Sequence, residues 1–229
     1  MEKVKFGIIC ALKAEAEGLI SRIENRDSRD ICGIIYNFGM IGKSSVVVAV
    51  CGMGKVNAAI CAQTMILTFN PDYIVNTGVA GALDNSLKTG DIVISDKLVQ
   101  HDVDTSVIGD PVGYISGTDV IFMESDKNLA SKIESAVKKF GYNYMVGTIA
   151  SGDQFIATKE SKDRIVRNFG AVACEMEGAA VAQVCYIAKV KFCILRSISD
   201  GADDNSNFDY VSFTKSSAEK SNRVLLSIL

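Results

Sequence analysis

The sequence predicts an α/β fold in a single domain spanning residues 1–229, on three observations. Short β-rich runs alternate along the chain with segments of helical period, as in a sheet covered by helices. Most of the β-rich runs are apolar throughout, which is typical of strands buried on both faces. No internal repeat, low-complexity segment or Pro- or Ser-rich linker marks a second domain, and 229 residues with 48% hydrophobic side chains can bury one core well.

Eight runs have the composition of strands. In chain order they are 5–10, 33–38, 46–50, 73–77, 91–95, 144–150, 171–175 and 192–198. Six segments have helical period. They are 15–23, 55–69, 127–140, 160–169, 178–188 and a last one from about Val211 to the C-terminus. The longest irregular part is 101–118, with three glycines and Pro111.

Two of these helices carry an apolar face that we expect to turn toward the core. In 55–69 this face contains Val56, Ala59, Ile60, Gln63 and Leu67. In 178–188 it contains Ala179, Ala180, Val184 and Ile187.

Composition excludes several classes of function. The 24 Lys and Arg nearly balance the 27 Asp and Glu, which argues against a nucleic-acid surface. Apolar stretches such as 46–51 are far shorter than the roughly 20 residues of a spanning helix, so no membrane partner is expected. The first apolar stretch is followed by Lys13, Glu15 and Glu17 rather than a cleavage site, so no secretory signal is expected either.

The seven cysteines are odd in number and form no C-x-x-C pair, which predicts reduced core residues in a cytoplasmic protein. His101 is the only histidine, so a zinc site and a Ser/His or Cys/His nucleophile have little to draw on. The Gly52-Met53-Gly54-Lys55 segment has neither P-loop nor dinucleotide-binding spacing. We therefore expect Lys55 to face solvent or to bond a neighbouring group.

Acidic residues gather where the predicted strands end. Glu15, Glu175, Glu177 and Asp200 all follow or close such strands, and Arg196 is the one cation embedded in an apolar run nearby. Ligands of open α/β sheets bind beyond the carboxyl ends of the strands. Two interpretations remain open: a structural ion pair of Arg196 with helix-start carboxylates, or an active site.

Several carboxylates without a metal or a nucleophile suit acid/base cleavage of a glycosidic bond. One acid protonates the leaving group, while an acidic pocket stabilises the oxocarbenium-like transition state. Phe155, Leu12 and Met53 would then supply flat, dry walls for an aromatic base.

At this point the residues resemble a known family, the bacterial 5′-methylthioadenosine/S-adenosylhomocysteine nucleosidases of the purine nucleoside phosphorylase/uridine phosphorylase superfamily. The matching motifs are spread over nearly the whole chain. They are Gly7-Ile8-Ile9-Cys10-Ala11-Leu12 with Glu15, residues 52–59, 76–81 and 90–96, His101-Asp102-Val103-Asp104, residues 151–156, Glu175-Met176-Glu177 and residues 196–200. The resemblance implies a three-layer α/β/α fold whose twisted, mixed sheet is partly barrel-like.

The activity that the resemblance implies is hydrolysis of the N-glycosidic bond of 5′-methylthioadenosine and S-adenosylhomocysteine without a cofactor or metal. At the base end, Asp200 would be the general acid that protonates adenine N7, held by Ser199. Phe155 would stack on the adenine and Ile156 would offer backbone hydrogen bonds to its edge.

At the sugar end, the resemblance makes Glu15 the base that polarises the attacking water, with Arg196 orienting carboxylates and water. Glu177 would bind ribose hydroxyls and Met176 would pack against the sugar. The expected substrate-binding set is completed by Glu175, Val79 and Gly81.

For the 5′ substituent, the resemblance implies a channel lined by Leu12, Met53 and a late aromatic, for which Tyr210 is preferred over Phe208. It also implies a homodimer in which the irregular loop after the fifth predicted strand completes the neighbour's pocket, so that Ile108 reaches across.

Three other functions stay open. A phosphorylase needs a cationic phosphate clamp, but residues 12–17 and 78–84 contain Lys13 and no Arg, which favours hydrolysis. A nucleosidase acting on 6-amino-6-deoxyfutalosine is not separated by residue pattern. A non-catalytic nucleoside-binding protein is disfavoured because acid, base and ribose carboxylate are all present.

Overall fold

The computed structural model describes residues 3–202 and 206–229, and only the backbone of 206–215. The strands of this part are β1 (Phe6–Cys10), β2 (Glu24–Ile31), β3 (Ile34–Ile41), β4 (Ser44–Val50), β5 (Tyr73–Ala82), β6 (Ile92–Gln100), β7 (Met123–Glu124), β8 (Tyr144–Ser151), β9 (Ala173–Glu175) and β10 (Lys191–Asp200). The helices are α1 (Lys13–Ile20), α2 (Lys55–Phe69), α3 (Lys127–Lys139), α4 (Lys159–Phe169), α5 (Gly178–Ala188), α6 (Ser206–Leu226) and the short 3₁₀ helix η1 (Ser106–Ile108).

The sheet closes on itself over part of its width. Its strand order is β10-β6-β8-β9-β5-β1-β4-β3-β2, and β10 also pairs with β5, so that β5, β10, β6, β8 and β9 form a ring. The sheet contains parallel pairs such as β1 with β5 and antiparallel pairs such as β10 with β6. The predicted mixed, partly barrel-like sheet is therefore confirmed.

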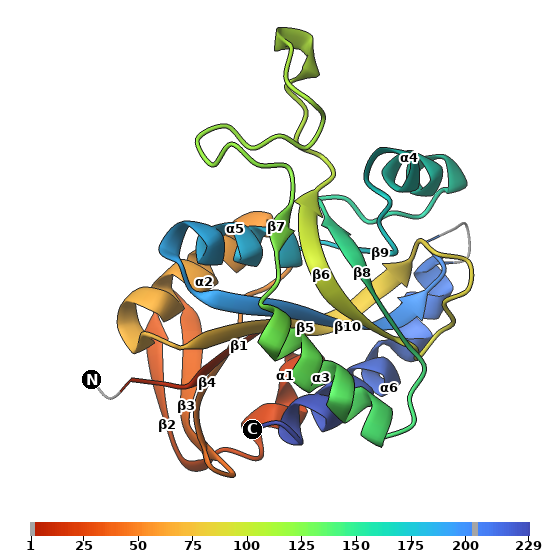
Figure 1. The fold of residues 1–229 in the computed structure, drawn as a ribbon. Helices are drawn as coiled ribbons and strands as arrows, with labels where there is room; N and C mark the ends of the chain where they lie inside the picture. The colour runs from red at the N-terminus through yellow and green to blue at the C-terminus, as the bar shows by residue number, and fades with distance from the viewer. Residues whose placement is uncertain (1–2, 203–205) are drawn as a thin grey trace.

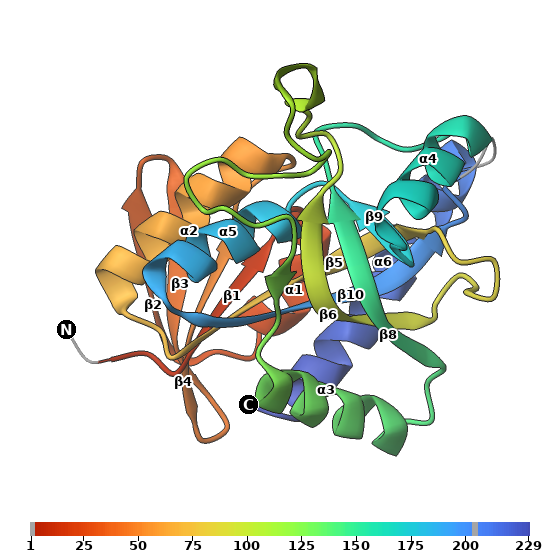
Figure 2. The same cartoon turned by 45° about the horizontal axis from the view of Figure 1, so that its top comes forward.

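Helices cover the sheet on two sides (Figure 1). The helices α2 and α5 lie against one side, where they pack on a cluster with β5, β6 and β10. The helices α1, α3 and α6 lie on the other side around a second cluster. Figure 2 shows α4 beside the ends of β8 and β9, and the loop that follows β6 projecting away from the sheet. This is the expected α/β/α layering.

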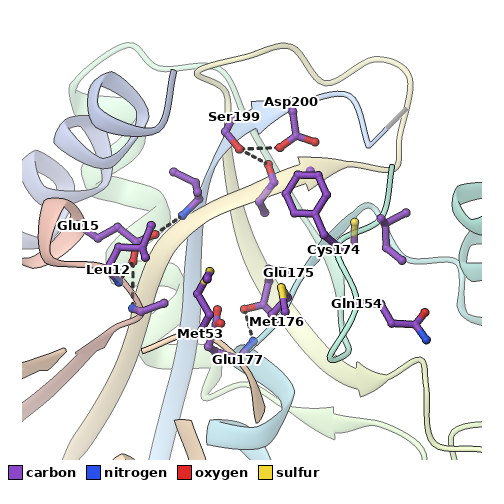
Figure 3. A pocket seen from close by; sticks show the side chains of 16 residues that line it. Leu12, Glu15, Met53, Gln154, Cys174, Glu175, Met176, Glu177, Ser199 and Asp200 are labelled. Atoms are coloured by element: carbon purple, nitrogen blue, oxygen red, sulfur yellow. Dashed lines mark hydrogen bonds between the residues drawn. The ribbon is translucent and has the colours of Figure 1, made fainter. Parts of the chain in front are cut away.

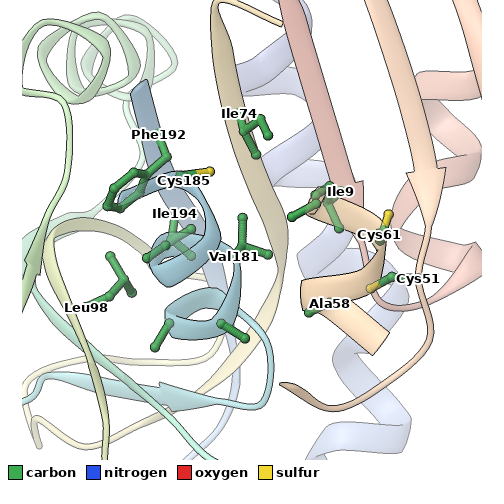
Figure 4. Close-up of a cluster of buried hydrophobic side chains, with 14 of the residues drawn as sticks. Ile9, Cys51, Ala58, Cys61, Ile74, Leu98, Val181, Cys185, Phe192 and Ile194 are labelled. Atoms are coloured by element: carbon green, nitrogen blue, oxygen red, sulfur yellow. The ribbon is translucent and has the colours of Figure 1, made fainter. Parts of the chain in front are cut away.

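The core between α2, α5 and the sheet is built from small and medium side chains (Figure 4). Ala58 and Cys61 of α2 and Val181 and Cys185 of α5 are fully buried there. Small residues let the two helices approach the strands closely, which is how interiors reach crystal-like packing density.

The predicted core face of α2 is wrong except at Ala59, which packs against the cluster, whereas Gln63 is exposed. Val56 is 68% exposed, Ile60 46% and Leu67 74%. The buried residues of this helix are Ala58, Cys61, Ala62, Met65 and Phe69. Because α2 is apolar on both faces, periodicity alone does not show which face packs.

The apolar face expected for α5 is correct in part. Ala179 and Ala180 are buried, Val184 is half-buried, and Ile187 is exposed.

Two strands were missed by the sequence patterns. The strand β2 reads Glu-Asn-Arg-Asp-Ser-Arg-Asp-Ile and is exposed almost throughout, because it is the edge strand of the sheet and edges are commonly protected by charge. It pairs with β3 across a turn in which Cys32 and Gly33 both have positive φ. The strand β7 has only two residues and no periodicity to read.

All seven cysteines are free thiols, and each except Cys32 is buried. Burial raises the pKa of these buried thiols, for example that of Cys61 to about 12. Among the described residues, no helix combines the length and apolar composition that a bilayer crossing requires.

Candidate active site

One cavity of about 440 Å³ opens where the strands β1, β8, β9 and β10 end and β5 passes by (Figure 3). Its walls come from segments that are far apart in the sequence. They are Ala11, Leu12, Glu15, Met53, Val79, Ala80, Gly81, Gln154, Phe155, Ile156, Cys174, Glu175, Met176, Glu177, Ser199 and Asp200.

All the predicted site residues line this cavity except three. Arg196 lies behind the wall and is buried, and Ile108 is 80% exposed on η1. Tyr210, like Phe208, falls among the residues 206–215 whose side chains lie outside the described part of the structure. The role expected for Ile108 therefore stays a prediction about a neighbouring chain.

Glu15 is held at the start of α1. It is the third residue of that helix, and its Oε2 accepts hydrogen bonds from the backbone N–H of Ala11 (3.0 Å) and Leu12 (2.9 Å). Its Oε1 accepts from Val79 N–H at 3.1 Å. Burial raises the pKa of Glu15, and Arg196 and these three N–H groups oppose that rise. The carboxylate is thus fixed in orientation inside a poorly solvated site.

Arg196 connects the acidic residues from below the cavity. Its Nη2 donates to Glu175 Oε2 and to Asn76 Oδ1, and Glu177 Oε2 lies 3.8 Å away. Arg196 is fully buried, which a guanidinium tolerates only with such compensation. The sequence left open a structural ion pair of Arg196 or an active site. The two interpretations are compatible, because the ion pair lies directly beside the cavity.

Gly78 leaves space on β5 for the side chains of Arg196 and Glu15. A Cβ at this position would come within 3.0 Å of both the Arg196 guanidinium and the Glu15 carboxylate. Only glycine leaves room for both side chains to lie against β5 at this point.

Glu175 and Glu177 are set by the start of α5. The Glu175 carboxylate accepts from the backbone N–H of Gly178 (2.8 Å) and Glu177 (3.1 Å) and from the Ser151 hydroxyl. Glu175 thus bonds both Arg196 and the start of α5 while it lines the cavity. Such donors at a helix N-terminus favour a negative charge.

Glu177 turns its carboxylate to the cavity. Its Oε1 accepts from Gly54 N–H at 2.8 Å, and its Oε2 is the more weakly held oxygen. Burial and the neighbouring Glu175 raise the pKa of Glu177 to about 7 against the pull of Arg196. This group can therefore change charge near neutral pH.

Asp200 ends β10 at the opposite end of the cavity. Its Oδ2 accepts from the Ser199 hydroxyl at 2.8 Å and its Oδ1 from Ala202 N–H at 2.9 Å. Among the described residues, no lysine or arginine nitrogen lies within 4.0 Å of this buried carboxyl. Gly81 allows its approach, because a Cβ there would lie 2.9 Å from Asp200 Oδ1.

The remaining wall is largely apolar. Phe155 and Met53 are exposed at the mouth, Leu12 and Met176 are half-buried and Ile156 is buried. Sequence reasoning missed four wall residues, which are Ala11, Ala80, Gln154 and Cys174. All but Cys174 belong to motifs already singled out, and Cys174 directly precedes Glu175.

Two strands run on beyond their predicted ends. The predicted runs end at residues 77 and 198, but β5 continues to Ala82 and β10 to Asp200, so that residues 78–81 and 199–200 lie within strands. The reason is that β5 and β10 pair along their full length up to Gly81 and Asp200. Partner strands thus carry the functional residues past the point where the apolar runs end.

No group of three or more His, Cys, Asp and Glu in the described ranges could hold a metal ion. Lys55, expected to face solvent or to bond a neighbour, bonds Asp102 beside the cavity.

Comparison with known proteins agrees with this geometry. Residues 5–229 match the family model of the phosphorylase superfamily. The chain is 37% identical to the 5′-methylthioadenosine/S-adenosylhomocysteine nucleosidase of Shewanella loihica, over 99% of both chains.

Solved structures give the same result. A mutant of the Helicobacter pylori 5′-methylthioadenosine nucleosidase with 5′-methylthioadenosine in its active site has a TM-score of 0.95 at 34% identity, covering 99% of this chain and 98% of that one. The futalosine hydrolase of Helicobacter pylori has a TM-score of 0.94 at 35% identity, covering 98% and 97%. The resemblance seen in the motifs is confirmed, and the chain belongs to the 5′-methylthioadenosine/S-adenosylhomocysteine nucleosidase family of the phosphorylase superfamily.

Proposed function

We propose that this chain hydrolyses the N-glycosidic bond of 5′-methylthioadenosine and S-adenosylhomocysteine, releasing adenine and the thioribose product. The observation that carries the proposal is the separation of acidic groups within one cavity. Glu15 and Glu177 lie near Arg196, while no Lys or Arg nitrogen of the described residues lies within 4.0 Å of the Asp200 carboxyl in the same cavity.

The reaction follows from this separation. Asp200 gives a proton to adenine N7 as the bond from C1′ to N9 breaks, so that the base leaves as a neutral molecule. Ser199 holds Asp200 through the hydroxyl hydrogen bond. Phe155 and Ile156 at the same end contact the purine.

The sugar becomes cationic in the transition state and is met by carboxylates. Glu15, fixed by three N–H groups, takes a proton from the water whose oxygen bonds to C1′. Glu177 accepts hydrogen bonds from the ribose hydroxyls, and Met176 packs against the ring. Arg196 keeps the carboxylates oriented without entering the cavity. No cofactor is needed for this step.

The same geometry favours water over phosphate as the attacking group. Among the described residues that line the cavity there is no Lys or Arg, and the Arg196 guanidinium bonds Glu175 and Asn76 instead. A phosphate would meet Glu15 without a cationic clamp.

An ultraviolet assay of adenine release from 5′-methylthioadenosine, with and without phosphate, tests the proposal. We expect equal rates in both buffers. Release that requires added phosphate would show a phosphorylase.

A second substrate is supported by the likeness to the Helicobacter pylori futalosine hydrolase. The proposed acid, base and ribose carboxylate would serve any adenine nucleoside with a 5′ extension. Parallel turnover of 5′-methylthioadenosine, S-adenosylhomocysteine and 6-amino-6-deoxyfutalosine ranks them, and a kcat/KM at least as high for the futalosine compound would shift the assignment.

The proposed assembly is a homodimer formed through the face that was wrongly expected to be core. Val56, Ile60 and Leu67 of α2 and Ile187 of α5 expose apolar side chains on adjoining helices. Exposed apolar patches of this kind mark interaction sites. In this dimer Ile108 completes the partner's 5′ channel.

Ile60→Asp tests the dimer. We expect this variant to sediment as a monomer at concentrations where the unaltered protein is a dimer. A dimer that persists in Ile60→Asp and in Leu67→Asp would remove this face from the interface.

The proposed products support a role in methionine salvage and the activated methyl cycle. The seven free thiols suit a reducing compartment and support the cytoplasm as its location.

A further inference from the structure

Two sequence motifs have no part in the proposed chemistry, Gly54-Lys55 and His101-Asp102. Lys55 begins α2 directly after the turn that carries Met53, and Asp102 lies just beyond the end of β6. Neither residue lines the cavity. Their side chains nevertheless meet, with Lys55 Nζ 2.6 Å from Asp102 Oδ1 and each side chain only 17% exposed.

A third residue closes this pair into a triangle. Asp102 Oδ2 accepts from Asp153 N–H at 2.8 Å, and Asp153 Oδ1 accepts from the backbone N–H of Lys55 at 2.7 Å. Lys55, Asp102 and Asp153 thus bond one another, and we name them the clamp. Charged groups strengthen all three of these bonds.

The clamp joins two walls of the cavity. On one side, Gly54 precedes Lys55 and donates its N–H to Glu177 Oε1 at 2.8 Å. On the other side, Asp153 directly precedes Gln154, Phe155 and Ile156, which line the cavity. The first wall receives the ribose and the second receives the purine.

The surroundings hold the clamp firmly. Lys55 Nζ also donates to Gln100 Oε1 at 2.9 Å, and Gln100 Nε2 donates to Gln183 of α5 at 2.5 Å. Burial raises the pKa of Asp102, but the bonds from Lys55 and from Asp153 N–H lower it by more. The net pKa therefore lies below the usual value. Asp102 is therefore ionised at neutral pH.

We propose that Lys55 and Asp102 are positioning residues whose ion pair, closed through Asp153, holds the Glu177 turn and the Phe155 turn at the spacing of a nucleoside. The proposal rests on the nucleosidase function proposed above. A nucleoside spans both turns, whereas free adenine touches only the purine wall. Loss of the clamp should therefore weaken nucleoside binding far more than adenine binding.

Lys55→Met and Asp102→Asn test this assignment. We expect each to raise the KM for 5′-methylthioadenosine about tenfold, with kcat and the inhibition constant of adenine within about threefold. The KM of the double variant should be no higher than that of the single variant with the higher KM, because both substitutions remove the same interaction. Lys55→Arg, which keeps the charge, should restore most of the affinity.

Lys138→Met is the matched control. Lys138 forms an exposed pair with Glu134 at 2.7 Å on α3, away from the cavity. Its KM should stay within about twofold of the unaltered protein.

Additive effects of the two single variants, or an unchanged KM, would overturn the positioning role. Equal weakening of adenine and nucleoside would also overturn it, because that result means general loss of the local fold. If Lys55→Met and Asp102→Asn fail to fold, Asp153→Ala, which removes the bond that Asp153 Oδ1 accepts from the Lys55 N–H at an exposed residue, gives the same comparison of nucleoside with adenine binding. Failure of the unaltered protein to release adenine would instead overturn the nucleosidase function itself.

Discussion

The two ends of the cavity hold acidic groups under opposite conditions. At the sugar end, Glu15, Glu175 and Glu177 share the field of one buried cation, Arg196. At the base end, Asp200 receives one hydroxyl and one N–H, and among the described residues no cationic nitrogen is in contact with it. The placement of one buried arginine therefore distinguishes the surroundings of the acidic groups at the two ends.

The largest effect is expected at the base end. Asp200→Asn keeps the oxygen that accepts from Ser199 or Ala202 but cannot protonate adenine N7. We expect kcat to fall by about 10³-fold, while binding of an adenosine analogue, measured by calorimetry, stays within about threefold. A non-catalytic nucleoside-binding protein would have no turnover to lose, so measurable wild-type turnover and its loss decide between the two functions.

Arg196→Met removes the cation that distinguishes the sugar end. Glu175 and Glu177 are then left buried without it, and we expect the free energy of unfolding at pH 8 to fall by about 3–5 kcal/mol, as for other broken buried ion pairs. The loss should be smaller at pH 5, where Glu177, with a pKa of about 7, is protonated. Urea unfolding at both pH values measures this, and equal stability of the variant at pH 8 would show that Arg196 does not compensate the carboxylates.

Glu15→Gln tests the base. The variant should fold and bind the nucleoside but turn over about 10²-fold more slowly, because the removed charge acts mainly in the transition state. Adenine release under single-turnover conditions is the measurement, with Glu17→Gln on the exposed side of α1 as the matched control. Activity within a few-fold of the unaltered protein would exclude Glu15 from the mechanism.

The smallest effect is a dependence on pH at the sugar end. The pKa of Glu177 is about 7 and that of Glu15 is also raised, and both groups act when deprotonated. We therefore expect kcat/KM to be about tenfold lower at pH 6 than at pH 8, since a group titrating at 7 is mostly protonated at 6. A flat profile between these pH values would contradict the role of Glu177.

Stability should change with pH in the opposite sense. A folded-state pKa above the unfolded value means that the folded protein holds its proton more tightly. The contribution of Glu177 to stability is therefore complete below about pH 4.5 and is lost as pH rises toward 7. Thermal unfolding of Glu177→Gln against pH isolates this contribution, because the variant should lack it.

The packed and the exposed face of α2 show what hydrophobic periodicity does not predict. The bounds of α2 and α5 follow directly from their residue patterns. The packed face of α2 does not, because Ala58 and Cys61 are small while Val56 and Leu67 are large and yet exposed. Close helix packing selects small residues, and an apolar face left outside is explained by the proposed partner chain.

The edge strand β2 marks a second limit of the sequence. Neither face of this strand is buried, so its charged sequence has no apolar alternation that would predict a strand. Its pairing with β3 depends on the turn between them and on β3 itself. A pattern can reveal an element only through the surface that the element buries.

The sequence by itself determined the chemistry available to this protein: carboxylates at strand ends, one arginine in an apolar run, and no metal or nucleophile set, in an order that resembles a nucleosidase family. Only the tertiary structure decided which of these carboxylates lie beside the arginine and which do not. The spacing of residues along the chain carries no record of the long-range contacts that place Arg196 beside Glu175 and Glu177 but not Asp200, or Lys55 beside Asp102. Those contacts depend on strand pairing across the closed ring and on Gly78 leaving room between Arg196 and Glu15.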